Sequence, residues 1–468
     1  MLKGEKTLKK SKYEIDMCSG PLLSKIIIFT LPLLLSSNLQ LLYNAADVIV
    51  VGRYAGKASL AAVGSTGSLT NLIVSLFIGL SIGASVAVAQ NYGANKWKDV
   101  SEVVHTSMLI SIISGIAVGL VGVIMARTFL IAMDTPADVI DKATLYMRIY
   151  FAGMPASMVY NFGSSILRAV GDTKRPLIFL TISGIINVIL NLIFVIAFDM
   201  DVAGVAIATV ISQVVSAVLV VICLMRFDGA CRLRLRDLKL HKDKLIQLVR
   251  IGLPAGIQSS LFSISNVLVQ SSVNSFGSVV IMAGNSAAAN IEGFIWVSMN
   301  SLHQAALTFV GQNVGARQYE RVKRVTGLCV SLVVVVGVVL GGLALLFGKE
   351  LLGIYAPGEE DVIGYGMIRL TIIAGTYWTC GIMDVLVGVL RGMGTSFVPM
   401  VVSVIGVCGG RIMWILTVFR AYMELKVLYI SYPISWVITA IILLLCVFVV
   451  YKKMVKKGSF ASTEAISV

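Results

Sequence analysis

The hexapeptide AQNYGA at residues 89–94 returns 222 residues later as GQNVGA at residues 311–316. The same spacing, within one residue, relates TLP (30–32) to GLP (252–254), Gly115 and Gly119 to Gly337 and Gly341, and LRAVGDTKRP (167–176) to LRGMGTSFVP (390–399). An offset kept over so long a stretch indicates an internal duplication. The sequence therefore predicts two halves of similar fold.

The chain that surrounds these repeated turns is too apolar for a water-soluble protein. Of its 468 residues, 57% are hydrophobic and 13% charged, with a mean hydropathy of +0.91, whereas soluble domains carry roughly 25% charged residues. Twelve apolar runs are long enough to cross a bilayer as helices. They lie near residues 26–50, 62–88, 103–126, 140–165, 176–198, 203–225, 246–274, 283–309, 325–347, 363–388, 398–419 and 427–451. We predict an all-α integral membrane protein with twelve transmembrane helices.

The basic residues orient these helices. Most of the 38 Lys and Arg residues fall in segments that share one side of the membrane, including 1–25, 226–250 and 452–457. Because cytoplasmic loops are enriched in Lys and Arg, both termini are predicted to be cytoplasmic. The net charge of +14 is spread between apolar runs rather than over one soluble face, so we expect no nucleic-acid partner. The seven cysteines show no CxxC spacing and are interpreted as small hydrophobic residues.

Six spans in each half bring both halves into the membrane from the same side. We therefore expect two six-helix lobes related by a pseudo-two-fold axis along the membrane normal. The predicted order is a cytoplasmic segment (1–25), an N-lobe (26–225), a cytoplasmic linker (226–245), a C-lobe (246–451) and a cytoplasmic tail (452–468). The paired glycines GIAVG (115–119) and GVVLG (337–341) are interpreted as close helix packing.

Asp47 is an acidic residue inside the first predicted span, where a charged side chain would be surrounded by lipid. It lies in the apolar stretch LLYNAADVIVVGR (41–53), 15 residues after Pro32, which is roughly 22 Å along a helix. A charge at the bilayer centre costs roughly 2.5–3.5 kcal/mol on insertion scales. Asp47 is then either a carboxylate that reaches the interface or a site for a cation or proton. Val269 occupies the matching position in the second half, so the scaffold does not require the charge, which favours a site.

Two amides in the fifth span are further candidates. Asn187 and Asn191 lie four residues apart on one helical face, and Thr209 in the sixth span offers a hydroxyl. Such amides either bond to neighbouring helices or offer carbonyl oxygens to a hard cation such as Na⁺.

The second half carries its own buried charges. Glu292 and Arg411 are placed at similar depths by the predicted spans, which favours a charge pair between them. Asp384 lies seven residues before Arg391 and either pairs with it or acts in transport or gating. His303 is interpreted as a core residue.

Several segments spread along the chain resemble one family. They are GPLLSKIIIFTLPLLLSSNLQLLYNAADVIVVG (20–52), the QNYGA turn, NVILN (187–191), VAGVAIATVISQ (202–213), AANIEGF (288–294) and the two LRxxG turns. Together they resemble the multidrug and toxic compound extrusion (MATE) family, in its bacterial DinF-like or NorM-like members. The resemblance extends over roughly residues 20–452.

The resemblance implies an antiporter with a central cavity that exports organic cations or amphipathic drugs in exchange for H⁺ or Na⁺. Asp47, Asn187 and Thr209 match the family's N-lobe cation site, and Asn191 stands where several members have aspartate. One carboxylate instead of two weakens Na⁺ binding and favours a proton on Asp47 as the coupling event. In the C-lobe, Glu292 and Asp384 resemble acidic positions used for coupling or substrate charge, and Arg411 is grouped with them. Pro32 is the expected hinge of the first span.

Other functions are kept as alternatives. A lipid-linked precursor flippase of the same superfamily is one, although the lone Arg411 of the eleventh span argues against it. A channel or a receptor is another. GRYAGKAS (52–59) lacks the spacing of a phosphate-binding loop. We therefore expect no enzymatic activity and no cofactor besides the coupling ion. The expected protein is a monomer in the cytoplasmic membrane, with lipid and drug-like organic cations as its partners.

Overall fold

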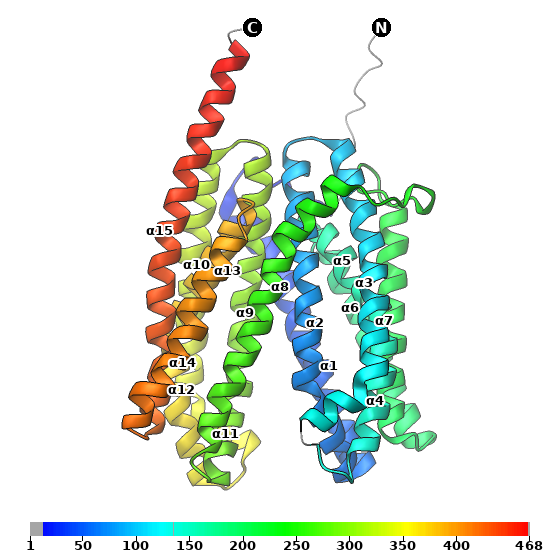
Figure 1. Cartoon of the computed structure of the whole chain (residues 1–468), viewed down its shortest axis with the longest axis vertical. Helices are drawn as coiled ribbons and strands as arrows, with labels where there is room; N and C mark the ends of the chain where they lie inside the picture. Colours follow the sequence, from blue (N-terminus) through cyan, green and yellow to red (C-terminus); the bar gives the residue numbers. More distant parts are fainter. Residues whose placement is uncertain (1–12, 134, 467–468) are drawn as a thin grey trace. The chain divides into compact units, whose positions relative to one another are not determined.

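The computed structural model describes residues 13–133 and 135–466, and within these ranges the chain forms helices and turns without a strand (Figure 1). Residues 1–12 of the predicted N-terminal segment and 467–468 of the predicted tail lie outside the described residues. The helices of the first half are α1 (Leu22–Val50), α2 (Gly56–Gly93), α3 (Trp97–Ala132), α4 (Ile140–Ala152), α5 (Met154–Ala169), α6 (Lys174–Leu192) and α7 (Asp201–Met225). Those of the second half are α8 (Lys242–Asn274), α9 (Val279–Gly315), α10 (Tyr319–Leu346), α11 (Gly348–Tyr355), α12 (Glu360–Gly392), α13 (Phe397–Ser403), α14 (Gly410–Trp414) and α15 (Leu425–Ile466).

The predicted twelve-helix membrane fold is confirmed. Within the described residues, ten helical segments are long and apolar enough to cross a membrane. The other two predicted spans, 140–165 and 283–309, coincide with the pair α4–α5 and with α9. Gly153 separates α4 from α5, and the ring of Pro155, which lacks an N–H donor, stands in the first turn of α5. α9 is long, but it buries polar side chains that lower its hydropathy. The protein is a multi-pass membrane protein.

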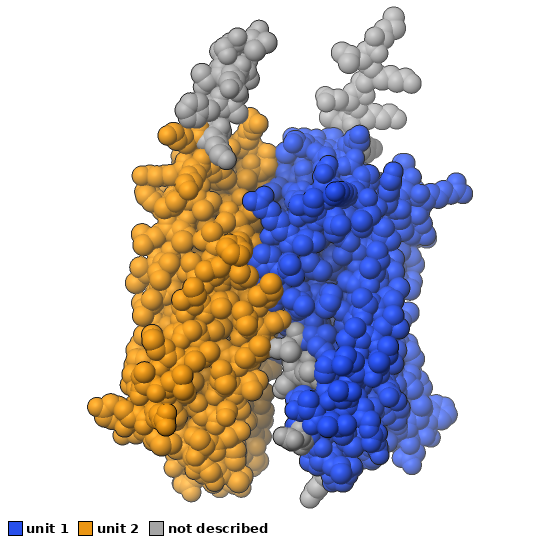
Figure 2. Space-filling view, in the orientation of Figure 1, with its two compact units in different colours: residues 1–17, 35–256 blue, residues 18–34, 257–468 orange. Residues whose placement is uncertain are grey.

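Contacts divide the chain into two compact units, coloured in Figure 2. Unit 1 comprises Leu35–Gly256 together with the segment that ends at Met17, and unit 2 comprises Cys18–Leu34 and Ile257–Val468. The boundary divides α1 two residues after Pro32 and divides α8 two residues after Pro254. A proline inside a helix removes one backbone hydrogen bond, so both divided helices carry a weak point at the boundary. The lobe limits 26–225 and 246–451 stay a prediction.

The duplication extends to the conformation of the backbone. Gly171 and Gly394, in the two LRxxG turns, have left-handed φ angles of 93° and 84°. In each turn the glycine N–H donates to the carbonyl oxygen three residues earlier, at 2.9 and 2.8 Å. Asn95 and Arg317, which follow the two QNxGA turns, have φ angles of 57° and 55°. The repeated letters therefore encode repeated turns.

The paired glycines pack helices closely, as predicted. A Cβ atom at Gly115 of α3 would lie 2.5 Å from the Cα atom of Pro155. At the corresponding place in unit 2, a Cβ atom at Gly337 of α10 would lie 2.8 Å from the Cα atom of Trp378. Both distances are too short for a real side chain, so in each unit two helices meet backbone to backbone.

A further glycine contact holds the first part of α8 within unit 1. A Cβ atom at Gly83 of α2 would lie 2.9 Å from the backbone nitrogen of Gly252, and one at Gly252 would lie 2.6 Å from the Cα atom of Leu80. Gly252 is two residues before Pro254. The part of α8 that precedes its proline is thus fixed tightly against α2.

Candidate functional site

The structure brings the four N-lobe candidates together in unit 1. The side-chain amide of Asn191 donates to the carboxylate of Asp47 and also to Oδ1 of Asn187, at 3.2 Å. The amide of Asn187 donates to the hydroxyl of Thr209 at 3.4 Å. That hydroxyl donates to the backbone carbonyl of Val205 at 2.9 Å. A continuous chain of hydrogen bonds therefore connects α1, α6 and α7.

The chain of hydrogen bonds is buried on the Asn side and partly open on the Asp side. Asn191 is 0% exposed and Asn187 5%, whereas Asp47 is half-buried. Oδ1 of Asn191 has no hydrogen-bond partner among the described residues. A buried polar atom left in this state costs about 1–3 kcal/mol. This oxygen is consequently ready to accept a proton donor or a cation.

A contact one turn away fixes the distance between α1 and α6. The ring of Tyr43 occupies the space where a side chain at position 184 would lie, because residue 184 is glycine. Tyr43 precedes Asp47 by four residues, and Gly184 precedes Asn187 by three, so these contacts lie on the faces that carry the polar groups. Gly184 thereby allows the approach that brings Asp47 to Asn191.

Both helices change their winding directly after the site. α1 passes into the π-helical turn η1 (Val51–Ala55), and α6 passes into the π-helical turn η2 (Ile193–Ala197). The two turns pack against each other, and Val50, Val51, Val195 and Val205 form an apolar cluster beside them. Single π-helical turns occur frequently at functional sites. The apolar runs of the sequence predict plain helices for both spans and do not reveal these turns.

The donor set suits a hard monovalent cation or a proton better than a divalent metal. Among the described residues there is no group of three or more His, Cys, Asp or Glu side chains placed to hold a metal ion. Asp47 supplies one carboxylate, and the remaining oxygens belong to two amides and one hydroxyl. Oxygen atoms of these types are ligands for hard cations. With a single negative charge, the site can neutralise one monovalent cation.

In unit 2, the predicted pair of Glu292 with Arg411 is wrong. Glu292 instead pairs with Arg369 of α12, with Nε to Oε1 at 2.9 Å and Nη2 to Oε2 at 2.7 Å. Both side chains are buried, and Nη1 of Arg369 donates to Oδ1 of Asn285 at 2.6 Å. The sequence analysis missed Arg369, although an arginine inside the predicted apolar span 363–388 was a signal that could have revealed it as a partner for a buried carboxylate.

Arg411 lies in α14, between the π-helical turns η4 (Val404–Gly409) and η5 (Ile415–Phe419). Its guanidinium carbon is 3.9 Å from the centre of the Tyr432 ring and 5.7 Å from the centre of the Trp436 ring. Nη1 donates to Oδ1 of Asn266 at 3.4 Å. Sequence reasoning missed the two aromatic residues because nothing in the sequence relates α15 to Arg411.

The sequence left two roles open for Asp384, an ion pair with Arg391 or a part in transport or gating. The structure does not show the ion pair. Arg391 donates from Nη2 to Oε1 of Gln258 at 2.9 Å. No ion pair in the described part of the chain includes the Asp384 carboxylate. Its backbone carbonyl accepts from Nδ1 of His303 at 2.6 Å. His303 is buried, in agreement with its interpretation as a core residue.

One titratable group lies in a turn outside the spans. Asp172, in the first LRxxG turn, is fully buried, and this burial raises the pKa of its carboxyl from 3.8 to about 6. The backbone N–H of Arg175 donates to its Oδ1 at 3.1 Å, and the Arg175 Nε lies 3.2 Å from Oδ2. These two contacts oppose the effect of burial on the pKa but do not cancel it.

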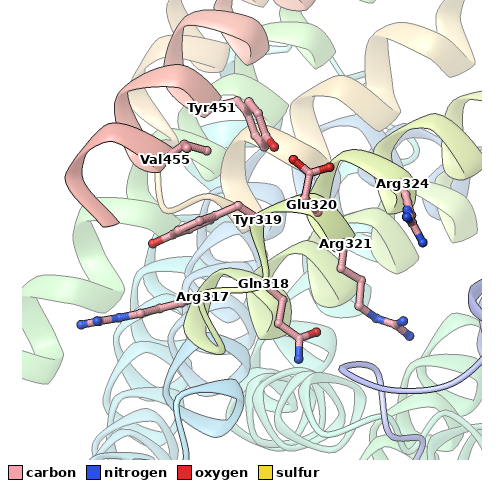
Figure 3. Close-up of a pocket in the computed structure, with 8 residues that line it drawn as sticks. All are labelled: Arg317, Gln318, Tyr319, Glu320, Arg321, Arg324, Tyr451 and Val455. Carbon is pink, nitrogen blue, oxygen red and sulfur yellow. The ribbon is translucent and has the colours of Figure 1, made fainter. Parts of the chain in front are cut away.

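A pocket of about 560 Å³ lies elsewhere in unit 2, where α10 begins (Figure 3). None of the predicted site residues lines this pocket. Its lining includes three arginines, two tyrosines and one carboxylate. The lining residues are Arg317, Gln318, Tyr319, Glu320, Arg321, Arg324, Tyr451 and Val455. In Figure 3 the side chains of Arg317 and Arg321 point in different directions. Nη2 of Arg321 donates to the backbone carbonyls of Ser19 and Gly20, at 2.6 and 3.0 Å. These arginines do not converge on a common point.

Known proteins share both the sequence pattern and the fold. The sequence profile of the MatE family matches residues 32–193 and again 254–416, so each match begins at the proline of a divided helix. The probable multidrug resistance protein YoeA of Bacillus subtilis (strain 168) is 29% identical over 429 residues, covering 89% of this chain and 91% of that protein.

Two solved structures share the fold at 22% identity. A crystal structure of MATE in the bent conformation has a TM-score of 0.87, with 95% of this chain and 98% of that chain covered. A crystal structure of MATE in the straight conformation has a TM-score of 0.88, with 96% and 100% covered.

Proposed function

Because this chain belongs to the MATE family of membrane transporters, we propose that it is a multidrug exporter that works as a cation-coupled antiporter. Organic cations and other amphipathic drugs leave the cell in exchange for a cation bound at Asp47. The observation that carries the proposal is the chain of hydrogen bonds from Asp47 to Thr209, in which the buried Asn191 has a carbonyl oxygen without a partner among the described residues. The relative YoeA, a probable multidrug resistance protein, supports the substrate class.

The exchanged cation is a proton in this proposal, and Na⁺ is the alternative. A charged Asp47 accepts the hydrogen bond that the Asn191 amide donates. A protonated Asp47 becomes a donor itself, and rotation of the Asn191 amide then offers Oδ1 in place of the N–H group. Protonation at Asp47 thus changes which hydrogen bonds α6 can make. A sodium ion would need several oxygens around one carboxylate, and the aspartate that would add a second charge is here Asn191.

Pro32 connects the exchange to the conformation of α1. The helix begins in unit 2, carries Pro32 two residues before the boundary, and ends beside Asp47 in unit 1. A helix bends most easily at a proline. The two solved MATE structures are described as being in a bent and in a straight conformation, so a transporter of this fold has more than one conformation. Loading of Asp47 would therefore alter the bend of α1 and, through it, the release of drug.

The energy available to such an exchanger is set by the membrane. Moving one charge across 100 mV is worth about 2.3 kcal/mol, which sustains roughly a 50-fold drug gradient per net charge moved. We place the protein in the cytoplasmic membrane with both termini in the cytoplasm, because the basic residues gather on one predicted side. We propose that it works as a monomer.

Ethidium efflux from energised cells tests the proposal. The wild-type protein is expected to lower ethidium accumulation, and an uncoupler is expected to abolish this effect while removal of sodium leaves it intact. Loss of efflux on sodium removal, with the uncoupler ineffective at constant membrane potential, would make Na⁺ the coupling ion. A protein that is inserted in the membrane and exports no dye in any condition would overturn the drug exporter and favour the flippase.

A further inference from the structure

Unit 2 contains a buried positive charge that forms no ion pair with any carboxylate of the described residues. Arg411 is 5% exposed, and no carboxylate of the described residues lies within ion-pair distance of it. Its hydrogen bond to Oδ1 of Asn266 is long, at 3.4 Å. Nε has no partner within the described residues. A guanidinium has five N–H donors, so most of the hydrogen-bonding capacity of Arg411 is unused.

The other two buried arginines of unit 2 differ from Arg411. Arg369 forms a two-pronged pair with Glu292 and has no charge left to neutralise. Arg391 shares with Arg411 the lack of an ion pair and an unpartnered Nε among the described residues, but its Nη2 donates to Oε1 of Gln258 at 2.9 Å, a shorter hydrogen bond than the one Arg411 makes to Asn266. Because Glu292 is fully occupied by Arg369, it cannot serve Arg411 without breaking an existing pair.

The rings beside Arg411 hold the guanidinium in place but do not neutralise it. Tyr432 is at cation–π distance, and Trp436 packs edge-on against Tyr432 with ring centres 5.5 Å apart. A ring face attracts a cation through its quadrupole, which carries no net charge. A charged residue inside a membrane protein otherwise pairs with an opposite charge or faces a polar cavity. The arrangement therefore holds a cation in a fixed orientation, and the part of the chain that the structure describes supplies no counter-charge for it.

The guanidinium lies next to the surface of unit 2. Asn266, which accepts its hydrogen bond, is an exposed residue. Arg411 is also framed by two π-helical turns, η4 and η5, a feature that this chain otherwise shows beside Asp47 and Asn191 among the described residues. Irregular helix thus accompanies both Arg411 and the site at Asp47 and Asn191.

We propose that Arg411 binds the anionic group of a substrate, such as the carboxylate of a zwitterionic amphipathic drug. This inference rests on the proposed export function and specifies which substrates unit 2 accepts. An arginine is well suited to the role because its planar guanidinium can donate two parallel hydrogen bonds to a carboxylate. Organic cations that lack an acidic group would not depend on this residue.

A matched pair of dyes tests the proposal. Rhodamine 110 has a free carboxyl group, and rhodamine 123 is its methyl ester, so the two differ only in the group that Arg411 would bind. Binding of each dye to the purified full-length protein is measured by fluorescence anisotropy, and transport is measured in proteoliposomes. Arg411→Gln is compared with Arg411→Lys and with Arg420→Gln, which removes an exposed arginine of the same unit.

Arg411→Gln is expected to weaken binding of rhodamine 110 by about tenfold or more. Binding of rhodamine 123 is expected to stay within about twofold of the wild type, while Arg411→Lys restores part of the rhodamine 110 binding and Arg420→Gln changes neither dye. Unchanged rhodamine 110 binding in Arg411→Gln, or an equal loss of both dyes, would overturn the inference. If the wild type binds both dyes and transports neither, the export function fails while the binding data still decide the role of Arg411.

Discussion

The side-chain amide of Asn191 donates a hydrogen bond to the carboxylate of Asp47, across 144 residues of sequence. The two residues come from helices that both change to π-helical winding within one turn. The amide also donates to Asn187, so its two N–H bonds are committed while its carbonyl oxygen has no partner among the described residues. The state of one carboxylate is thereby coupled to the orientation of one amide.

Replacement of Asp47 by Asn is expected to abolish export of ethidium against a gradient. The amide can keep a hydrogen bond to Asn191 but cannot bind and release a cation. Dye accumulation in energised cells measures the effect, with melting temperature in detergent as the check on folding. Asp141→Asn is the control, because that carboxylate is 79% exposed and pairs with Arg127 at a surface. Export by Asp47→Asn at the wild-type rate would exclude Asp47 as the coupling site.

Replacement of Asn191 by Asp is expected to make export dependent on sodium. The change gives the site a second carboxylate next to Asp47, and two negative charges attract Na⁺ more strongly than one. Dye transport in proteoliposomes is measured as a function of sodium concentration at constant pH. We expect export by the variant to rise with sodium concentration and saturate, whereas export by the wild type stays the same at every sodium concentration. An identical sodium response in both proteins would contradict the role given to residue 191.

Replacement of Gly184 by Ala is expected to separate α1 from α6. The added methyl group overlaps the ring of Tyr43, and overpacking of this kind costs about 1–3 kcal/mol. Export should fall several-fold and the melting temperature should decrease. Gly64→Ala is the matched control, because a Cβ atom at Gly64 meets no atom within 4 Å. Equal behaviour of the two variants would show that the Tyr43 contact does not position the site.

Breaking the pair of Glu292 and Arg369 is expected to destabilise the protein strongly. Glu292→Leu or Arg369→Leu alone leaves one buried charge unpaired, which costs about 3–5 kcal/mol. The double variant removes both charges and should recover most of the loss. Thermal unfolding in detergent gives the comparison. A double variant no more stable than the single ones would indicate that the pair contributes more than mutual neutralisation.

The stability of the first LRxxG turn is expected to depend on pH through Asp172. Its pKa is about 6 in the folded protein and 3.8 in the unfolded chain, so the folded state holds the proton more tightly. Below about pH 4 both states are protonated, and the contribution of the group to stability no longer changes with pH. As the pH rises from about 4 to 6, its contribution falls by up to about 3 kcal/mol, and above pH 6 it stays constant. The melting temperature of the wild type should fall over this range relative to Asp172→Asn, which keeps an acceptor for the Arg175 N–H. Parallel pH profiles would contradict the raised pKa.

Much of the fold follows from patterns of residue type. The length of the apolar runs predicted the spans, and motifs repeated at a fixed offset predicted the duplication, because both can be recognised without knowing how each helix is rotated about its axis. The meeting of Asp47 with Asn187, Asn191 and Thr209 followed from the family resemblance. The sequence pattern alone offered these residues only as candidates.

The remainder depends on geometry that no residue type marks. Whether Glu292 faces Arg369 or Arg411 is decided by how α12 and α14 are rotated about their axes. The predicted depth of a residue in the membrane cannot distinguish these two partners. The turns η1 and η2 arise from one extra residue per turn, and their sequences VGRYA and IFVIA resemble ordinary helix. The helix break at Gly153 lies inside one continuous apolar run of the sequence, which predicts a single span. Pro155, two residues later, is the one residue of that run that indicates a helix start there.

Val269 takes the place in α8 that Asp47 takes in α1, and it is buried and apolar. With one exchange position instead of two, a cycle that admits one monovalent cation and exports one monovalent organic cation moves no net charge. Such a cycle is electroneutral and responds to the ion concentration ratio alone. The same cycle with a zwitterionic cargo is electrogenic and responds to membrane voltage as well. The cargo, rather than the transporter, would then determine whether export draws on the electrical part of the gradient.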